Sequence, residues 1–133
     1  MMRLYSLLFV LFAWVAACEG AGPRDPFWGK QACGHCRMLL GEPRYAGQVL
    51  TADAEHLYFD DIGCMVEHLE EAQSPPRGVW VRHGTSWVDA RAARYASGAP
   101  SPMGYGFVPE ANGSLDFSAV RASIRARRTA RRP

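Results

Sequence analysis

The 133-residue sequence lacks the motifs of several large enzyme classes. It has no phosphate-binding loop, no dinucleotide-binding glycine fingerprint and no serine-nucleophile motif. A long hydrophobic run is also missing, because the apolar stretch from Leu4 to Ala17 is shorter than the roughly 20 residues that a membrane-spanning helix needs. With 48% hydrophobic and 21% charged residues, the composition is typical of a globular protein. The sequence therefore indicates no enzyme class apart from the thiol chemistry considered below.

The first 17 residues have the pattern of an export signal. Arg3 precedes the apolar stretch, and small residues close it. The run Val15-Ala16-Ala17-Cys18 resembles the lipobox of bacterial lipoproteins, in which the signal is cut before a cysteine that is then acylated. An ordinary signal with an unmodified Cys18 is the alternative. We expect a signal peptide at 1–17 and lipidation of Cys18, which would anchor the protein on a cell membrane or outer membrane, facing the periplasm or the exterior.

Cysteines are few and, after lipidation, odd in number. Setting Cys18 aside leaves Cys33, Cys36 and Cys64. An odd number in an exported protein leaves a free thiol or indicates a site that needs thiolates. A purely structural disulfide framework is therefore disfavoured, although a single Cys33–Cys36 disulfide remains an alternative.

Acidic residues are absent from the C-terminal end. Residues 121–133 contain six arginines and no acid, whereas residues 18–120 contain 8 basic and 13 acidic residues. This basic C-terminal tail is expected either to touch anionic lipid headgroups or to be the solvated end of a helix. Export argues against a nucleic-acid partner.

The hydrophobic pattern predicts an α+β fold of one small domain at 33–120, preceded by a glycine- and proline-rich tether at 18–32. Two strands of a hairpin are expected at 48–51 and 56–59, followed by a helix at 62–72 that Asp60 or Asp61 caps. Further strands are expected at 79–81, at 87–89 and within 103–108, and residues 90–96 fit a strand or a helix. Asp116 or Ser118 caps a last helix that ends near Arg128. This order predicts two small β-β-α-like halves.

The segment Cys33-Gly34-His35-Cys36-Arg37-Met38 carries the most chemistry. Thiolates and thioethers favour soft ions such as Cu(I), zinc or iron–sulfur clusters. If the segment is extended, Cys36 and Met38 point to one face and His35 to the other. Met65 falls on the apolar stripe of the predicted helix and is expected in the core.

Four stretches together resemble one family. They are Cys36-x-Met38, the segment 59–65 (Phe-Asp-Asp-Ile-Gly-Cys-Met), the segment 87–95 that starts Trp-Val-Asp-Ala, and Ser101-Pro102-Met103-Gly104. With the lipobox, they are similar to the NosL family, copper-binding lipoproteins that accompany nitrous oxide reductase. The similarity covers roughly residues 30–109.

The resemblance implies a membrane-tethered carrier that hands Cu(I) to an apo-enzyme or its assembly complex, with nitrous oxide reductase as the recipient. It implies a two-part α+β fold akin to that of the organomercurial lyase MerB. By position, Cys36, Met38 and Met103 match the family's metal ligands, and Cys33 and Cys64 match those of some members.

Two other functions are open. Cys33 and Cys36 have the spacing of a thiol–disulfide oxidoreductase, but that fold places the pair between a buried strand and a helix, which the residues around it do not predict. Cys33, Cys36, Cys64 and His68 have the number and type of ligands for a structural zinc site.

Overall fold

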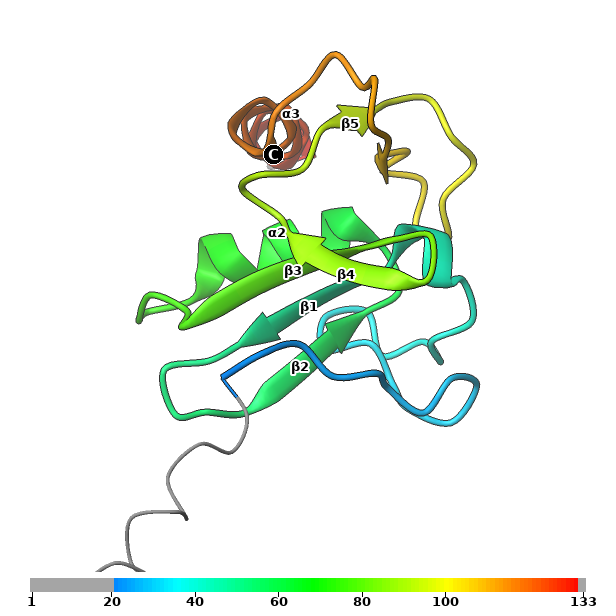
Figure 1. The fold of residues 1–133 in the computed structure, drawn as a ribbon. Coiled ribbons are helices and arrows are strands. Elements are labelled where there is room, and N and C mark those ends of the chain that lie inside the picture. The colour runs from blue at the N-terminus through cyan, green and yellow to red at the C-terminus, as the bar shows by residue number, and fades with distance from the viewer. Residues whose placement is uncertain (1–20, 132–133) are drawn as a thin grey trace, which may run out of the picture.

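The computed structural model describes residues 21–131, so the expected signal peptide and Cys18 lie outside the described part of the chain. These residues form an α+β structure with a four-stranded antiparallel sheet, a two-stranded sheet and two α-helices (Figure 1). Neither described helix is long and apolar enough to cross a membrane.

The four-stranded sheet confirms the predicted hairpin and extends it. Its strands are β1 (Gly47–Leu50), β2 (His56–Phe59), β3 (Gly78–His83) and β4 (Ser86–Asp89), in the order β2-β1-β3-β4. All four residues of the central strand β1 are buried, because strands flank it on both sides and other segments cover its faces. The two expected strand pairs thus share one sheet.

Helix α2 (Ile62–Glu71) follows β2 directly. Its N-cap is Asp61, whose Oδ1 accepts a hydrogen bond from the Gly63 N–H at 2.8 Å. The stripe of Ile62, Met65 and Val66 is fully buried, which confirms Met65 as a core residue. The backbone of β1 approaches this stripe closely, because a Cβ atom on Gly47 would lie 2.5 Å from the Met65 sulfur.

The short strand expected within 103–108 begins only at the last residue of that range. A 3₁₀ turn (η1, Pro43–Tyr45) precedes β1, and a short pair consists of β5 (Tyr95–Ala96) and β6 (Val108–Pro109). Most of 103–107 is a loop because Gly104 and Gly106 take left-handed backbone angles, with φ of 74° and 82°, that interrupt an extended strand.

Helix α3 (Phe117–Arg131) includes most of the expected basic tail. The Asp116 carboxylate accepts from the Ala119 N–H at 2.8 Å, so Asp116 is the cap. Phe117, Val120 and Ile124 are buried against the core. Residues 121–131 continue the helix, so of the two alternatives for the basic tail the structure has the helix end, and the helix runs three residues beyond Arg128.

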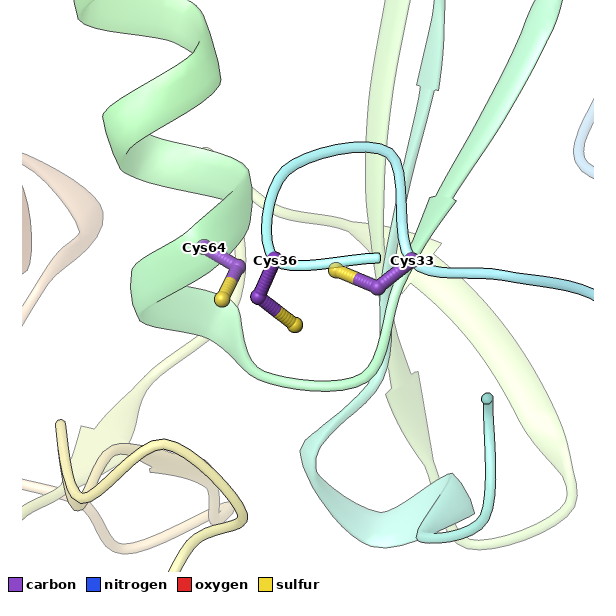
Figure 2. Close-up of side chains that lie close together, drawn as sticks. All are labelled: Cys33, Cys36 and Cys64. Carbon is purple, nitrogen blue, oxygen red and sulfur yellow. The ribbon is translucent and has the colours of Figure 1, made fainter. Parts of the chain in front are cut away.

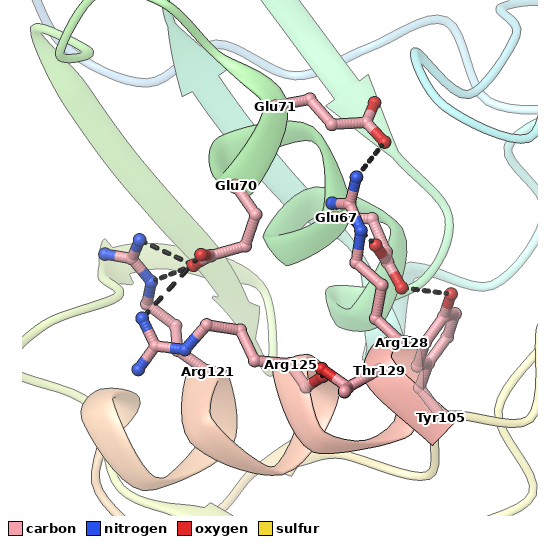
Figure 3. Close-up of polar contacts among 8 residues, drawn as sticks. All are labelled: Glu67, Glu70, Glu71, Tyr105, Arg121, Arg125, Arg128 and Thr129. Atoms are coloured by element: carbon pink, nitrogen blue, oxygen red, sulfur yellow. Dashed lines mark hydrogen bonds and ion pairs between the residues drawn. The ribbon is translucent and has the colours of Figure 1, made fainter. Parts of the chain in front are cut away.

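The arginines of α3 pair with glutamates of α2 (Figure 3). Arg121 binds Glu70 at 2.6 Å. Arg128 bridges Glu67 at 3.3 Å and Glu71 at 2.9 Å, and Glu67 is buried. The acidic body and the basic end of the sequence therefore neutralise each other at a helix–helix contact.

This contact predicts unequal effects for two neighbouring arginines. Arg128→Ala should lower the free energy of unfolding by about 1–2 kcal/mol, because it leaves the buried Glu67 carboxylate without its cation. Arg125→Ala is the matched control. Its side chain is 53% exposed and lies 3.7 Å from Glu70, so its loss should cost less than about 0.5 kcal/mol. Equal effects in urea unfolding would contradict a structural role for Arg128.

The segment expected to be a tether packs on the domain from Arg24 onward. The Arg24 N–H donates to the Gln48 side chain at 2.9 Å, and the Trp87 indole donates to Asp25 at 2.8 Å. Trp28 packs against the core. These contacts lay residues 24–32 along the sheet and carry Cys33 to the end of β2.

Candidate metal centre

Three thiols from two distant parts of the chain come together. The Sγ atoms of Cys33, Cys36 and Cys64 all lie within 4.8 Å of one another. Figure 2 shows Cys33 and Cys36 on one turn, facing Cys64 on the first turn of α2. Cys33 and Cys64 are fully buried and Cys36 is half-buried, and all three are free thiols.

A tight turn holds Cys33 and Cys36. The Arg37 N–H donates to the Cys33 carbonyl at 3.1 Å, and the Cys33 N–H donates to the Met38 carbonyl at 2.7 Å. Arg37 takes a left-handed φ of 67°. The segment is therefore not extended, so the condition under which Cys36 and Met38 would share one face is not met: these two hydrogen bonds fold the chain back on itself.

Gly34 fixes this turn against β2. Its N–H donates to the Tyr58 carbonyl at 2.8 Å, and a Cβ atom here would lie 3.1 Å from the Phe59 ring. A side chain at this position would push the turn, and with it both thiols, away from the sheet.

The two aspartates after β2 have separate roles. Asp60 is buried and accepts from the Gly41 and Glu42 N–H groups at 2.8 and 2.9 Å, which ties the chain that leaves the cysteine turn to the end of β2. Asp61 caps α2, so that Cys64, the third helical residue, is held in the first turn beside Cys33.

Hydrogen bonding sets the proton affinities of the three thiols apart. The Cys64 thiol donates to Cys33 and, with the N–H groups of His35, Cys36 and Asp60, lowers the pKa of Cys33 to about 5, although burial opposes the shift. The same bond to Cys33, together with burial, raises the pKa of Cys64. Burial is also the main cause of the raised pKa of Cys36. Without metal, the site therefore holds one thiolate and two thiols at neutral pH.

This arrangement predicts a thiolate that survives in acid. Ultraviolet absorbance of the reduced protein should show one thiolate step near pH 5, far below the ordinary pKa of 9.0. The step should move toward higher pH in Cys64→Ala, which removes the thiol donor. Since the folded-state pKa is lowered, the stability that the Cys33 thiolate contributes is complete above pH 9 and is lost as the pH falls to about 5. A single step near pH 9 would contradict this electrostatic account.

The two candidate methionines have exposed side chains. The backbone of Met103 is nevertheless fixed near the site, because its N–H donates to Asp61 Oδ2 at 2.9 Å and the Ser101 hydroxyl donates to the same oxygen at 2.6 Å. The Gly106 N–H in turn donates to Ser101. The loop that carries Met103 is therefore fastened to the N-terminus of α2, and ligation by Met38 and Met103 stays a prediction.

No histidine belongs to the cluster of close ligand atoms within residues 21–131. His35 lies half-buried in the turn. His68 packs against Phe59, with ring centroids 5.2 Å apart, and burial followed by the nearby His35 lowers its pKa. The site that the structure assembles is thus Cys33, Cys36 and Cys64 without the fourth ligand of the zinc hypothesis.

Asp61 has a role that the sequence does not reveal. Its position predicts a helix cap, but nothing in the spacing indicates that its second oxygen binds a loop some 40 residues later. The proximity of Ser101 and Met103 to Asp61 depends on the tertiary fold.

The spacing of the thiols suits a three-coordinate soft ion. Metal–sulfur bonds of about 2.3 Å in a trigonal plane place the sulfurs about 4.0 Å apart. The sulfurs here are within 4.8 Å, so closing around an ion needs side-chain movements of less than about 1 Å.

In comparisons with known proteins, no family model, curated protein or solved structure matches this chain.

Proposed function

We propose that this protein is a membrane-tethered Cu(I) metallochaperone whose binding site is Cys33, Cys36 and Cys64. The observation that carries the proposal is the convergence of the three Sγ atoms within 4.8 Å. Cu(I) is soft and accepts low coordination numbers, so three sulfurs without a fourth ligand satisfy it. Zinc, in contrast, prefers four ligands in a structural site.

The burial pattern suits a site that releases its ion. Cys33 and Cys64 would hold the ion from inside, while half-buried Cys36 lies at the edge. An incoming thiolate or thioether from a recipient can reach the metal at this edge. Met38 and Met103, both exposed, are the additional sulfur ligands that the NosL resemblance suggests.

Three parts of the proposal are supported by the sequence alone: export of the protein, the enzyme that receives the copper, and the MerB-like arrangement of the fold. The lipobox-like run supports lipidation at Cys18 and a location outside the cytoplasm. The resemblance to the NosL family supports a two-part MerB-like fold and delivery to an exported copper enzyme, with nitrous oxide reductase as the leading recipient. Binding and delivery require no catalytic step by this chain.

Thiol–disulfide exchange is the second candidate, and the lowered pKa of Cys33 favours it. Exchange needs a thiolate that a substrate disulfide can reach. Here Cys33, which has the lowered pKa, is fully buried, and the more accessible Cys36 has a raised pKa. Accessibility and thiolate character fall on different residues, so we favour metal binding.

A competition titration tests the proposal. The anaerobically reduced protein should remove about one Cu(I) per chain from a chromogenic Cu(I) chelator, and it should show no reductase activity toward a standard disulfide substrate. Met65→Leu, which removes a buried sulfur outside the cluster, should bind copper as the parent does. Tight Zn(II) retention with no Cu(I) uptake would overturn the proposal, as would efficient disulfide reduction without metal uptake.

A further inference from the structure

Exposed apolar side chains concentrate on one segment near the N-terminus. Within residues 21–131, four large apolar side chains are exposed, and three of them lie between residues 27 and 40, here named the N-terminal ribbon. Phe27 is 78%, Met38 62% and Leu39 58% exposed. Side chains of this kind gathered on a short segment are typical of a contact surface.

The ribbon is fixed by its own backbone. The Gly29 N–H donates to the Leu40 carbonyl at 2.7 Å, and the Leu40 N–H donates to the Gln31 carbonyl at 2.9 Å. Leu40 is buried while its neighbour Leu39 is exposed. The backbone therefore presents Leu39 outward from an ordered position, and the exposure does not come from a loose chain end.

The ribbon is also basic. Residues 27–40 include Lys30 and Arg37, both exposed, and no acidic residue. Within the described part of the chain neither forms a salt bridge, whereas Arg121 and Arg128 of α3 are paired with glutamates of α2. Lys30 and Arg37 are therefore two exposed cations on the same segment as the exposed apolar side chains.

The sequence places the ribbon close to the expected anchor. Cys18 precedes Phe27 by only nine residues, which span at most about 30 Å when fully extended. In Figure 1 the first described residues and the ribbon lie on the β2 side of the four-stranded sheet, while α3 lies beyond its opposite side. An anchored chain would hold the ribbon, and not α3, next to the bilayer.

We propose that the N-terminal ribbon docks on an anionic lipid bilayer, with Phe27 and Leu39 inserted at the interface and Lys30 and Arg37 at the phosphates. Apolar burial and attraction to anionic headgroups are the two contributions that hold peripheral segments on membranes. The inference rests on the membrane tether of the proposed function. It requires no bound copper, although the ribbon also contains Cys33 and Cys36.

Photo-crosslinking to lipid tests the contact. The full chain, produced with its leader in a bacterial host and purified from membranes, is reconstituted into phosphatidylcholine–phosphatidylglycerol vesicles that contain a lipid with a diazirine on its acyl chain. Mass spectrometry should find crosslinks in the ribbon. The Phe27→Ser, Leu39→Ser double variant should lower them about tenfold, since it removes much of the buried apolar area. Phe27→Leu is the matched control and should retain them.

Two other crosslinking outcomes would contradict docking of the ribbon on the bilayer. Crosslinks confined to residues before Ala21 would show that the anchor holds the chain while the ribbon stays in water. Crosslinks on α3 in place of the ribbon would mean that the basic helix faces the bilayer. Copper stoichiometry measured on the same samples separates the two proposals: the double variant should bind copper normally, and ribbon crosslinks in a protein that takes up no copper would support the docking and refute the metallochaperone.

Discussion

Cys33→Ser is expected to lower the affinity for Cu(I) by at least about 100-fold, which exceeds the usual cost of losing a partner outside the ligand set. Cys33 is buried at the centre of the cluster, and its pKa, lowered to about 5 by the hydrogen bond from Cys64, makes it the thiolate that is available without proton release. A serine hydroxyl stays protonated at neutral pH and is a hard oxygen donor that Cu(I) disfavours. The measurement is competition against a chromogenic Cu(I) chelator under anaerobic conditions.

Two comparisons make this result specific. Met38→Leu removes an exposed sulfur five residues away and should cost less affinity than Cys33→Ser, if thiols and not thioethers dominate binding. A urea unfolding curve of the metal-free Cys33→Ser protein shows whether the domain stays folded. An unchanged copper affinity in a folded Cys33→Ser protein would remove Cys33 from the site.

Asp61→Ala is expected to lower the free energy of unfolding by about 3–5 kcal/mol, a large part of the 5–15 kcal/mol typical of a whole domain. The fully buried carboxylate accepts hydrogen bonds from Gly63, Ser101 and Met103. Its removal uncaps α2 and leaves the buried Ser101 hydroxyl without its acceptor. Urea unfolding followed by tryptophan fluorescence measures the change.

Asp61→Asn and Ser101→Ala separate the two roles of Asp61. Asp61→Asn keeps an oxygen that accepts from the Gly63 N–H, but its amide NH₂ faces the Met103 N–H, so two donors meet there. The free energy of unfolding of this variant should therefore fall by about half as much as that of Asp61→Ala. Ser101→Ala removes the hydroxyl that donates to Asp61 and accepts from the Gly106 N–H, and it should cost about 1–2 kcal/mol. A loss below about 1 kcal/mol for Asp61→Ala would show that the loop is held by other contacts.

Local patterns in the sequence predict the elements that surround the site. The hydrophobic pattern of 48–51 and 56–59 predicts β1 and β2, and the apolar stripe of Ile62, Met65 and Val66 predicts α2. The capping residues before each helix predict where the helices start, and the structure selects Asp61 and Asp116 from the candidates. These features depend on neighbours within a few residues, which a single sequence contains.

Long-range features were harder to predict. The CxxC spacing of Cys33 and Cys36 fits both an extended segment and the observed turn, and the turn is decided by hydrogen bonds to Met38 and Tyr58. The proximity of Cys64 follows from Gly34 packing on β2 just before α2 begins. The pairing of the α3 arginines with Glu67 and Glu70 equally depends on how two separate helices pack.

The structure also changes which candidate ligands come first, because the tertiary fold decides which side chains meet. The resemblance to the NosL family puts Cys36, Met38 and Met103 first and Cys33 and Cys64 second. The structure brings together Cys33, Cys36 and Cys64, while Met38 and Met103 have exposed side chains. The exposed thioethers are therefore better placed to take part in exchange than to hold the ion.

X-ray absorption at the copper edge, on the protein loaded with one equivalent of Cu(I), tests the three-thiolate site most directly. We expect a first shell of three sulfurs at about 2.3 Å with no nitrogen or oxygen neighbour, and a fall to two sulfurs in Cys64→Ser. A shell dominated by nitrogen or oxygen, or a spectrum that Cys64→Ser leaves unchanged, would contradict the account.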